Sequence, residues 1–130
     1  MRTVNLEDPA RRGGRALTGD PAEVLRMKKL TGHLWARLME LEEDGLQMIS
    51  PTDPKAADVW TVWVAFPGRN NREMVRRLRE DWGVLCQLGS YGVKGHFPQE
   101  AVCFDLGPEN SFEEMDYVQD AVYKLLSGSV

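Results

Sequence analysis

Hydrophobic residues recur at helical spacing in three stretches of the chain. The first and longest stretch has intervals of three or four residues: Met27, Leu30, Leu34, Leu38 and Leu41. This spacing places all five side chains on one face of an α-helix. Asp20 can cap that helix and Gly45 can end it. The same period predicts helices over 72–82 and about 112–126, and Ser111 begins the last one with a capping box.

Short apolar runs between the helices predict four strands, over 46–50, 59–66, 84–88 and 101–106. The second run, VWTVWVAF, has almost no polar break, which is typical of a strand covered on both faces. The element order is helix, strand, strand, helix, strand, strand, helix, with short connections. It predicts an α/β (α+β) two-layer sandwich, in which three helices pack on one face of an about four-stranded, mostly antiparallel sheet.

The length of 130 residues suits one domain, which we expect over 21–130. Residues 1–20 lack an apolar period and carry Arg11, Arg12 and Arg15, so they are predicted to form a flexible basic arm. The net charge of −4 disfavours a nucleic-acid partner. No apolar run is long enough for a bilayer span or a signal peptide, so we expect a cytoplasmic protein with no membrane partner.

The residues that could carry chemistry are few. Cys86 and Cys103 each lie inside a strand pattern and outside any CxxC pair, which predicts two reduced, buried thiols. The two cysteines and two histidines do not have the spacing of metal ligands. His33 lies beside the main helical stripe and is expected at the surface or boundary. We therefore predict no catalytic residue and no metal site in this chain.

The stretch GSYGVKGHFP, residues 89–98, is the strongest candidate for a binding segment. Its glycines could let backbone N–H groups hold a phosphate, although the spacing differs from known phosphate loops. It could reach into a partner's ligand site, or it could simply connect two adjacent strands, which is the favoured interpretation. The candidate contacts to a ligand or partner are Ser90, Tyr91, Lys94 and His96.

Three segments carry a family resemblance: DVWTVWVAFPG, MVRRLREDWGVLCQLG and EAVCFDLGPENSFEEMDYVQDAV. Together they resemble the C-terminal small domain of the class V aminotransferases, the pyridoxal-phosphate enzymes that include the cysteine desulfurases. The resemblance spans about residues 22–127. Asn110, Ser111, Glu114 and Asp116 match the family's last segment.

The chain departs from that family where the chemistry is carried. Cys103 stands where the family has an arginine for the substrate carboxylate, and a thiol cannot supply that bidentate contact. The loop at 89–98 lacks the cysteine of the desulfurases, and 130 residues leave no room for the large cofactor domain.

The resemblance therefore implies a stand-alone or split small domain that is not a complete enzyme by itself. It would be a non-catalytic subunit that completes a partner, either a large-domain pyridoxal-phosphate protein or a homo-oligomer. Pyridoxal phosphate would then be held by the partner chain and not covalently by this one. The alternative is a regulatory module that binds a small molecule at a dimer interface.

Overall fold

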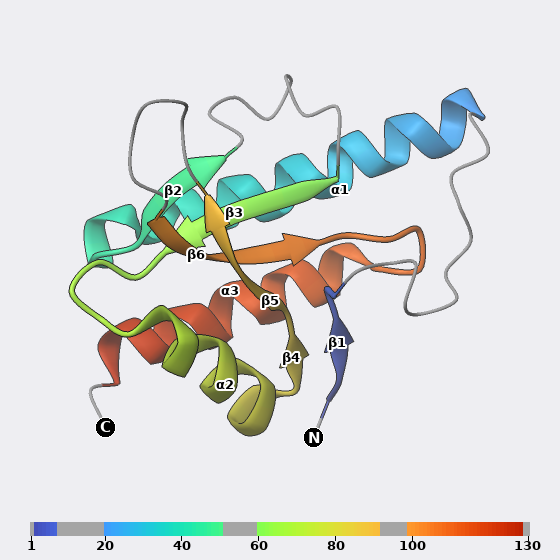
Figure 1. The fold of residues 1–130 in the computed structure, drawn as a ribbon. Coiled ribbons are helices and arrows are strands. Elements are labelled where there is room, and N and C mark those ends of the chain that lie inside the picture. The colour runs from blue at the N-terminus through green and yellow to red at the C-terminus, as the bar shows by residue number, and fades with distance from the viewer. Residues whose placement is uncertain (1, 8–19, 51–59, 92–98, 129–130) are drawn as a thin grey trace.

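A computed structural model of the chain describes residues 2–7, 20–50, 60–91 and 99–128 (Figure 1). The helical elements are α1 (Pro21–Met39), the short 3-10 helix η1 (Glu40–Asp44), α2 (Asn71–Trp82) and α3 (Phe112–Ser127). The strands are β1 (Val4–Asn5), β2 (Gln47–Ser50), β3 (Thr61–Ala65), β4 (Val84–Leu85), β5 (Gln87–Tyr91) and β6 (Gln99–Asp105).

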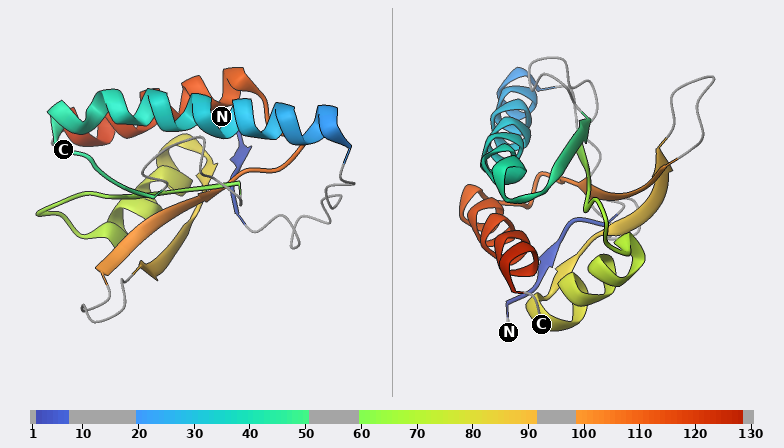
Figure 2. Two further views of the ribbon diagram at one scale, coloured as in Figure 1. Left: turned by 90° about the horizontal axis from the view of Figure 1, so that it is seen from above. Right: turned by 90° about the vertical axis from the view of Figure 1, so that its left-hand side faces the viewer.

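Four strands form an antiparallel sheet in the order β2-β3-β6-β5, and the three helices pack on one of its faces (Figure 2). The predicted two-layer fold is therefore confirmed. A small parallel pair, β1 with β4, is added to it. None of the helices in the described ranges has the length and apolarity that a bilayer span requires.

The helix ends lie where the capping residues predict them. The Asp20 carboxylate accepts a hydrogen bond from the N–H of Ala22 at 2.9 Å, which caps α1. Gly45 ends η1 with a φ of 109°, a left-handed conformation that favours glycine. Ser111 and Glu114 form the predicted capping box, in which each side chain accepts from the other residue's N–H.

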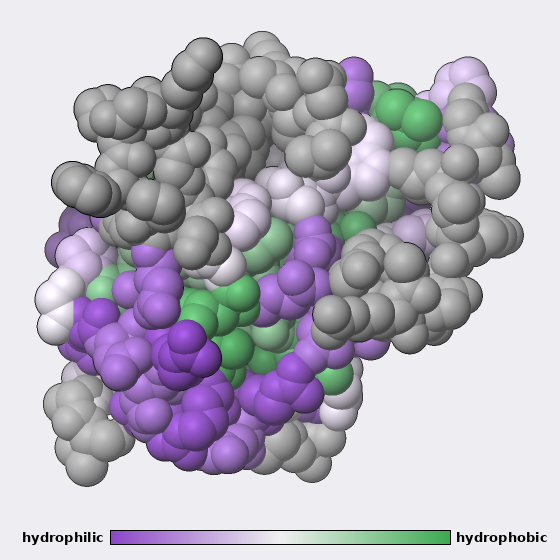
Figure 3. Space-filling model, viewed as in Figure 1, coloured by the Kyte–Doolittle hydropathy of each residue, from purple (hydrophilic) through white to green (hydrophobic). Residues whose placement is uncertain are grey.

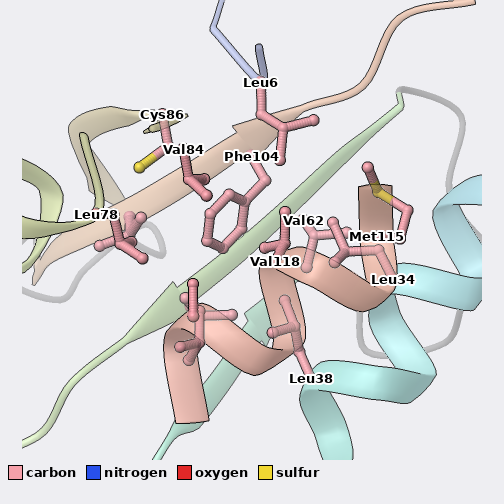
Figure 4. Close-up of a cluster of buried hydrophobic side chains, with 14 of the residues drawn as sticks. Leu6, Leu34, Leu38, Val62, Leu78, Val84, Cys86, Phe104, Met115 and Val118 are labelled. Atoms are coloured by element: carbon pink, nitrogen blue, oxygen red, sulfur yellow. The ribbon is translucent and has the colours of Figure 1, made fainter. Parts of the chain in front are cut away.

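The hydrophobic core lies between the sheet and the helices. Phe104 and Val62 point from the sheet toward Leu34 and Leu38 of α1, and Met115 and Val118 of α3 complete the cluster (Figure 4). All six side chains have no solvent exposure. Outside the core, hydrophilic residues gather over α2, at the lower left of Figure 3. The apolar periods read from the sequence therefore mark the side chains that hold the two layers together.

The N-terminal residues contribute a strand that the sequence analysis did not predict. Val4 and Leu6 are fully buried, and Leu6 hydrogen-bonds to both Leu85 and Asp105 through its backbone. This short segment therefore belongs to the fold, because it satisfies backbone groups of β4 and β6. Residues 8–19, with the three arginines of the expected arm, lie outside the described residues, and an arm there stays a prediction.

The strand predicted over 84–88 is divided in the structure. Val84 and Leu85 pair with β1, whereas β5 pairs with β6 from Gln87 onward. Cys86 lies between the two strands and belongs to neither. The change of partner strand is the physical reason for the break, and no local sequence signal marks it.

Candidate functional site

We call the face of the sheet that points away from the described helices the helix-free face. Side chains alternate between the two faces of a strand, so the neighbours of the core residues Val62, Val102 and Phe104 lie on this face. The strand register groups them as Thr61, Trp63, Gln87, Gly89, Ala101, Cys103 and Asp105. Ala101 and Cys103 are buried but lie outside the core cluster, which agrees with this assignment.

Trp63 forms an aromatic platform on the helix-free face. A Cβ atom at Gly89 would lie only 2.8 Å from Cη2 of the Trp63 ring, so the ring rests directly above this glycine. Trp63 comes from β3 and Gly89 from β5, with β6 between them. Ala101 pairs with Gly89 and is small enough for the ring to cross β6. Two small residues thus allow the indole to lie along the sheet, where it is partly exposed.

Cys103 lies beside this platform and is a poor nucleophile. It pairs with Trp63 on one side and Gln87 on the other, and it is 4% exposed. Burial raises the pKa of its thiol well above the ordinary value, and the neighbouring carboxylate of Asp105 raises it further. A neutral buried thiol neither attacks a substrate nor binds a metal at neutral pH.

Cys86 lies on the opposite side, in the core near Leu78 and Val84 (Figure 4). Burial raises the pKa of its thiol to about 12. Both cysteines are free and buried, as the strand patterns predict. The thiols of this chain are therefore structural, and neither of them replaces the missing cysteine of the 89–98 loop.

The four candidate contacts predicted from the sequence are only partly within the described residues. Ser90 and Tyr91 are the last two residues of β5 and pair with Glu100 and Gln99 of β6. Both belong to a strand and not to a loop. Lys94 and His96 lie outside the described residues. The proposed ligand or partner role of all four stays a prediction.

The residues that match the family's last segment have structural roles here. The Asn110 amide is buried, accepts from the N–H of Gly107 at 2.8 Å and donates to Asn5 and Glu114. It thereby ties β1 to the start of α3. Ser111 and Glu114 cap the same helix. These contacts explain the matching residues without a ligand.

His33 lies at a partly exposed contact between α1 and α3. Its Nε2 lies 2.8 Å from the Asp116 carboxylate, and its ring meets the Phe112 ring edge-on at 5.3 Å. Arg37 shares the same carboxylate at 3.2 Å. His33 thus belongs to a surface ion cluster that joins two helices, at the boundary position that its place beside the helical stripe predicts.

The described residues do not fit a resident pyridoxal phosphate. A Schiff base needs a lysine that faces the cofactor, but the described lysines, Lys28, Lys29 and Lys124, are exposed on α1 and α3. Lys55 and Lys94 lie outside the described ranges. The same ranges hold no group of three side chains that could bind a metal ion. We therefore derive no reaction step through a cofactor or metal on this chain.

Comparison with known proteins gives a likeness among the solved structures. No protein-family model matches the chain, and no curated protein matches it. A solved structure of a NIFS-like protein does match, with a TM-score of 0.57 and 26% sequence identity. The likeness covers 78% of this chain but only 27% of the NIFS-like protein. It supports a relationship to the cysteine desulfurase-like proteins.

The sequence analysis did not single out four residues of the helix-free face, namely Trp63, Gln87, Gly89 and Asp105. For Trp63 a signal does exist in the run VWTVWVAF, where Val62 and Val64 alternate with Thr61 and Trp63. This alternation is hidden because both faces of β3 carry apolar side chains. The contact between Trp63 and Gly89 depends on strand pairing, which the sequence does not specify.

Proposed function

We propose that this chain is a small domain of the cysteine desulfurase-like type that acts as a non-catalytic subunit and completes a partner protein. The observation that carries the proposal is the likeness to a NIFS-like protein, of which this chain covers only 27%. A domain that corresponds to part of a larger relative is suited to work beside a chain that supplies the rest.

The chemistry of the described residues supports the non-catalytic role. The position of the family's carboxylate arginine is taken by Cys103, whose thiol is buried and held neutral by its raised pKa. Cys86 is equally buried in the core. Pyridoxal phosphate, where it takes part, would be held by the partner chain.

The helix-free face is the surface that we propose for the partner. It presents the partly exposed ring of Trp63, which rests on Gly89 and Ala101, and aromatic anchors of this kind are typical of interface hot spots. The side-chain nitrogen of Gln87 on the same face is buried and has no hydrogen-bond partner in the described structure. The Gln87 side chain would have to turn outward before a partner carbonyl could satisfy that donor.

The test is a purification of the full chain, with a tag, from cells of its own source. Borohydride reduction fixes pyridoxal phosphate on its lysine, and peptide mass spectrometry then locates the modified residue. We expect the modified lysine in a co-purified protein and no modification on this chain. A modified lysine on this chain, or recovery of the chain without any pyridoxal-phosphate protein, contradicts the proposal.

Two aromatic substitutions on opposite sides of the molecule sharpen the test. Trp63→Ala removes the proposed anchor on the helix-free face and should abolish recovery of the partner. Tyr123→Ala removes an aromatic ring that is 44% exposed on α3 and should leave recovery unchanged. If the two variants retain equal amounts of the pyridoxal-phosphate protein, the helix-free face is not the docking surface.

A further inference from the structure

Two strands of the four-stranded sheet have an edge that no other strand of the described structure pairs with. The sheet order places β2 at one end and β5 at the other. The outer N–H and C=O groups of such a strand can pair with another strand. Proteins usually protect these edges with charged residues, proline or an irregular strand.

The two edges differ in their protection. The pairing of β2 with β3 shifts register between Met48 and Ser50, and such a bulge makes the strand irregular as a template. β5, in contrast, pairs with β6 in unbroken register over five residues, from Gln87 to Tyr91. Its sequence, QLGSY, contains no charged residue and no proline. Within the described residues, β5 is therefore the regular edge strand that carries neither a charge nor a proline.

The described elements near β5 lie on its inner side or beneath it. The backbone of Leu6 donates to Leu85 at 2.7 Å and accepts from Asp105 at 2.9 Å, so β1 lies between β4 and β6. Arg72 of α2 contacts Glu100 of β6 at 3.6 Å, and Glu100 alternates onto the same face as the core residue Val102, so α2 lies on the helix-covered face. Neither element pairs with the outer edge of β5.

We propose that β5 is the edge through which two copies of this chain associate, by antiparallel pairing of the two β5 strands around a two-fold axis. Antiparallel pairing of identical strands matches donors and acceptors of one copy with those of the other. The chain has a net charge of −4, so two copies repel each other in most relative orientations. The β5 edge carries no charged residue, so two β5 edges can meet without like-charge repulsion between them.

This association does not depend on the proposed function. It uses the edge of the sheet, whereas the proposed protein partner uses its helix-free face. The two surfaces meet at Gly89, which lies at the middle of β5 and beneath the Trp63 ring. The dimer therefore brings the two Trp63 platforms onto the same face of one continuous sheet, one on each side of the two-fold axis.

The first test is sedimentation equilibrium of the full chain over a range of concentrations. We expect the mass to rise from 14.7 kDa toward twice that value. Ser90→Lys adds a charge to β5, and it should weaken association by about ten-fold or more. Ser50→Lys makes the same change on the bulged edge of β2 and should leave association unchanged. Thermal unfolding followed by circular dichroism establishes that both variants are folded.

A second measurement needs no variant. Backbone hydrogen exchange of the outward-pointing N–H groups in Gln87–Tyr91 should slow as the concentration of the unaltered chain rises, because the dimer protects those groups, whereas the N–H groups that point to β6 are already paired in the monomer. A mass of 14.7 kDa at every concentration overturns the proposal, as does equal weakening by the two lysine variants. Strong protection of the outward-pointing N–H groups of β5 in a monomer also overturns it, since the edge would then be covered by the chain itself.

Discussion

The two faces of the sheet use the same strands for different purposes. The face toward the helices carries large aliphatic and aromatic side chains, among them Phe104, Val62 and Val64, and all three are fully buried. The helix-free face carries a ring, small residues and polar groups, including Trp63, Ala101 and Asp105. The first set fills a core and holds the fold together, whereas the second lies outside the core cluster.

The cysteines illustrate the same division. Cys86 belongs to the core and Cys103 to the helix-free face, yet burial raises the pKa of both thiols. Part of the helix-free face, at Cys103, is therefore shielded from solvent although no described helix covers it. Burial by itself does not distinguish the faces, and the energetic role of each face has to be measured.

The largest expected effect is on the helix-covered face. Phe104→Ala should lower the free energy of unfolding by about 3–5 kcal/mol, because it leaves a cavity among well-packed neighbours. Trp63→Ala should cost only about 1–2 kcal/mol, since the ring is partly in water and packs against one strand pair. Urea unfolding measures both values. Equal losses would mean that the helix-free face is also a core face.

The second prediction concerns the pH dependence of stability. The folded-state pKa of Cys86 is raised to about 12, so the folded state holds the thiol proton more tightly than the unfolded state. The resulting stability is fully present below about pH 9 and is lost as the pH rises toward about 12. The slope for this one group is at most about 1.4 kcal/mol per pH unit.

The measurement is urea unfolding between about pH 8 and about pH 11 for the unaltered chain and for Cys86→Ala. Lysines and tyrosines titrate in the same range, but they contribute equally to both proteins. The difference between the two curves should therefore shrink steadily above about pH 9. A constant difference would show that Cys86 is more solvated than its place in the core indicates.

Local signals predicted most of the fold. Asp20, Ser111 and Gly45 lie at the helix ends because capping depends on residues close in sequence. The apolar period also identified the core side of each helix. β1 was not predicted, because a two-residue strand has no period and its partner, β4, lies some eighty positions away.

The candidate site was less predictable for a related reason. The platform exists only because β3, β6 and β5 pair in one register, which places Trp63 over Gly89. A sequence without pairing information shows a tryptophan in an apolar run and a glycine in a turn-rich segment. The glycines and polar side chains of 89–98 directed attention to that segment instead, because they form a pattern that is visible without strand pairing.

The smallest expected effect tests the platform itself. Gly89→Ala places a methyl group 2.8 Å from Cη2 and 3.2 Å from Cζ3 of Trp63, so the ring must move. Gly89 is not among the described glycines with positive φ, so the cost comes from crowding and not from backbone strain. The ring is the far end of a partly exposed side chain and can shift, which limits the loss to about 1 kcal/mol.

A double-mutant cycle isolates this contact. Gly89→Ala should cost less in the Trp63→Ala background, with a coupling of about 0.5 kcal/mol or more measured by urea unfolding. If the cost is the same in both backgrounds, the ring does not rest on Gly89, and the platform would have to be assigned to other residues. A coupling of the expected size shows that the helix-free face, although it contributes little to stability, is ordered by side-chain contacts before any partner binds.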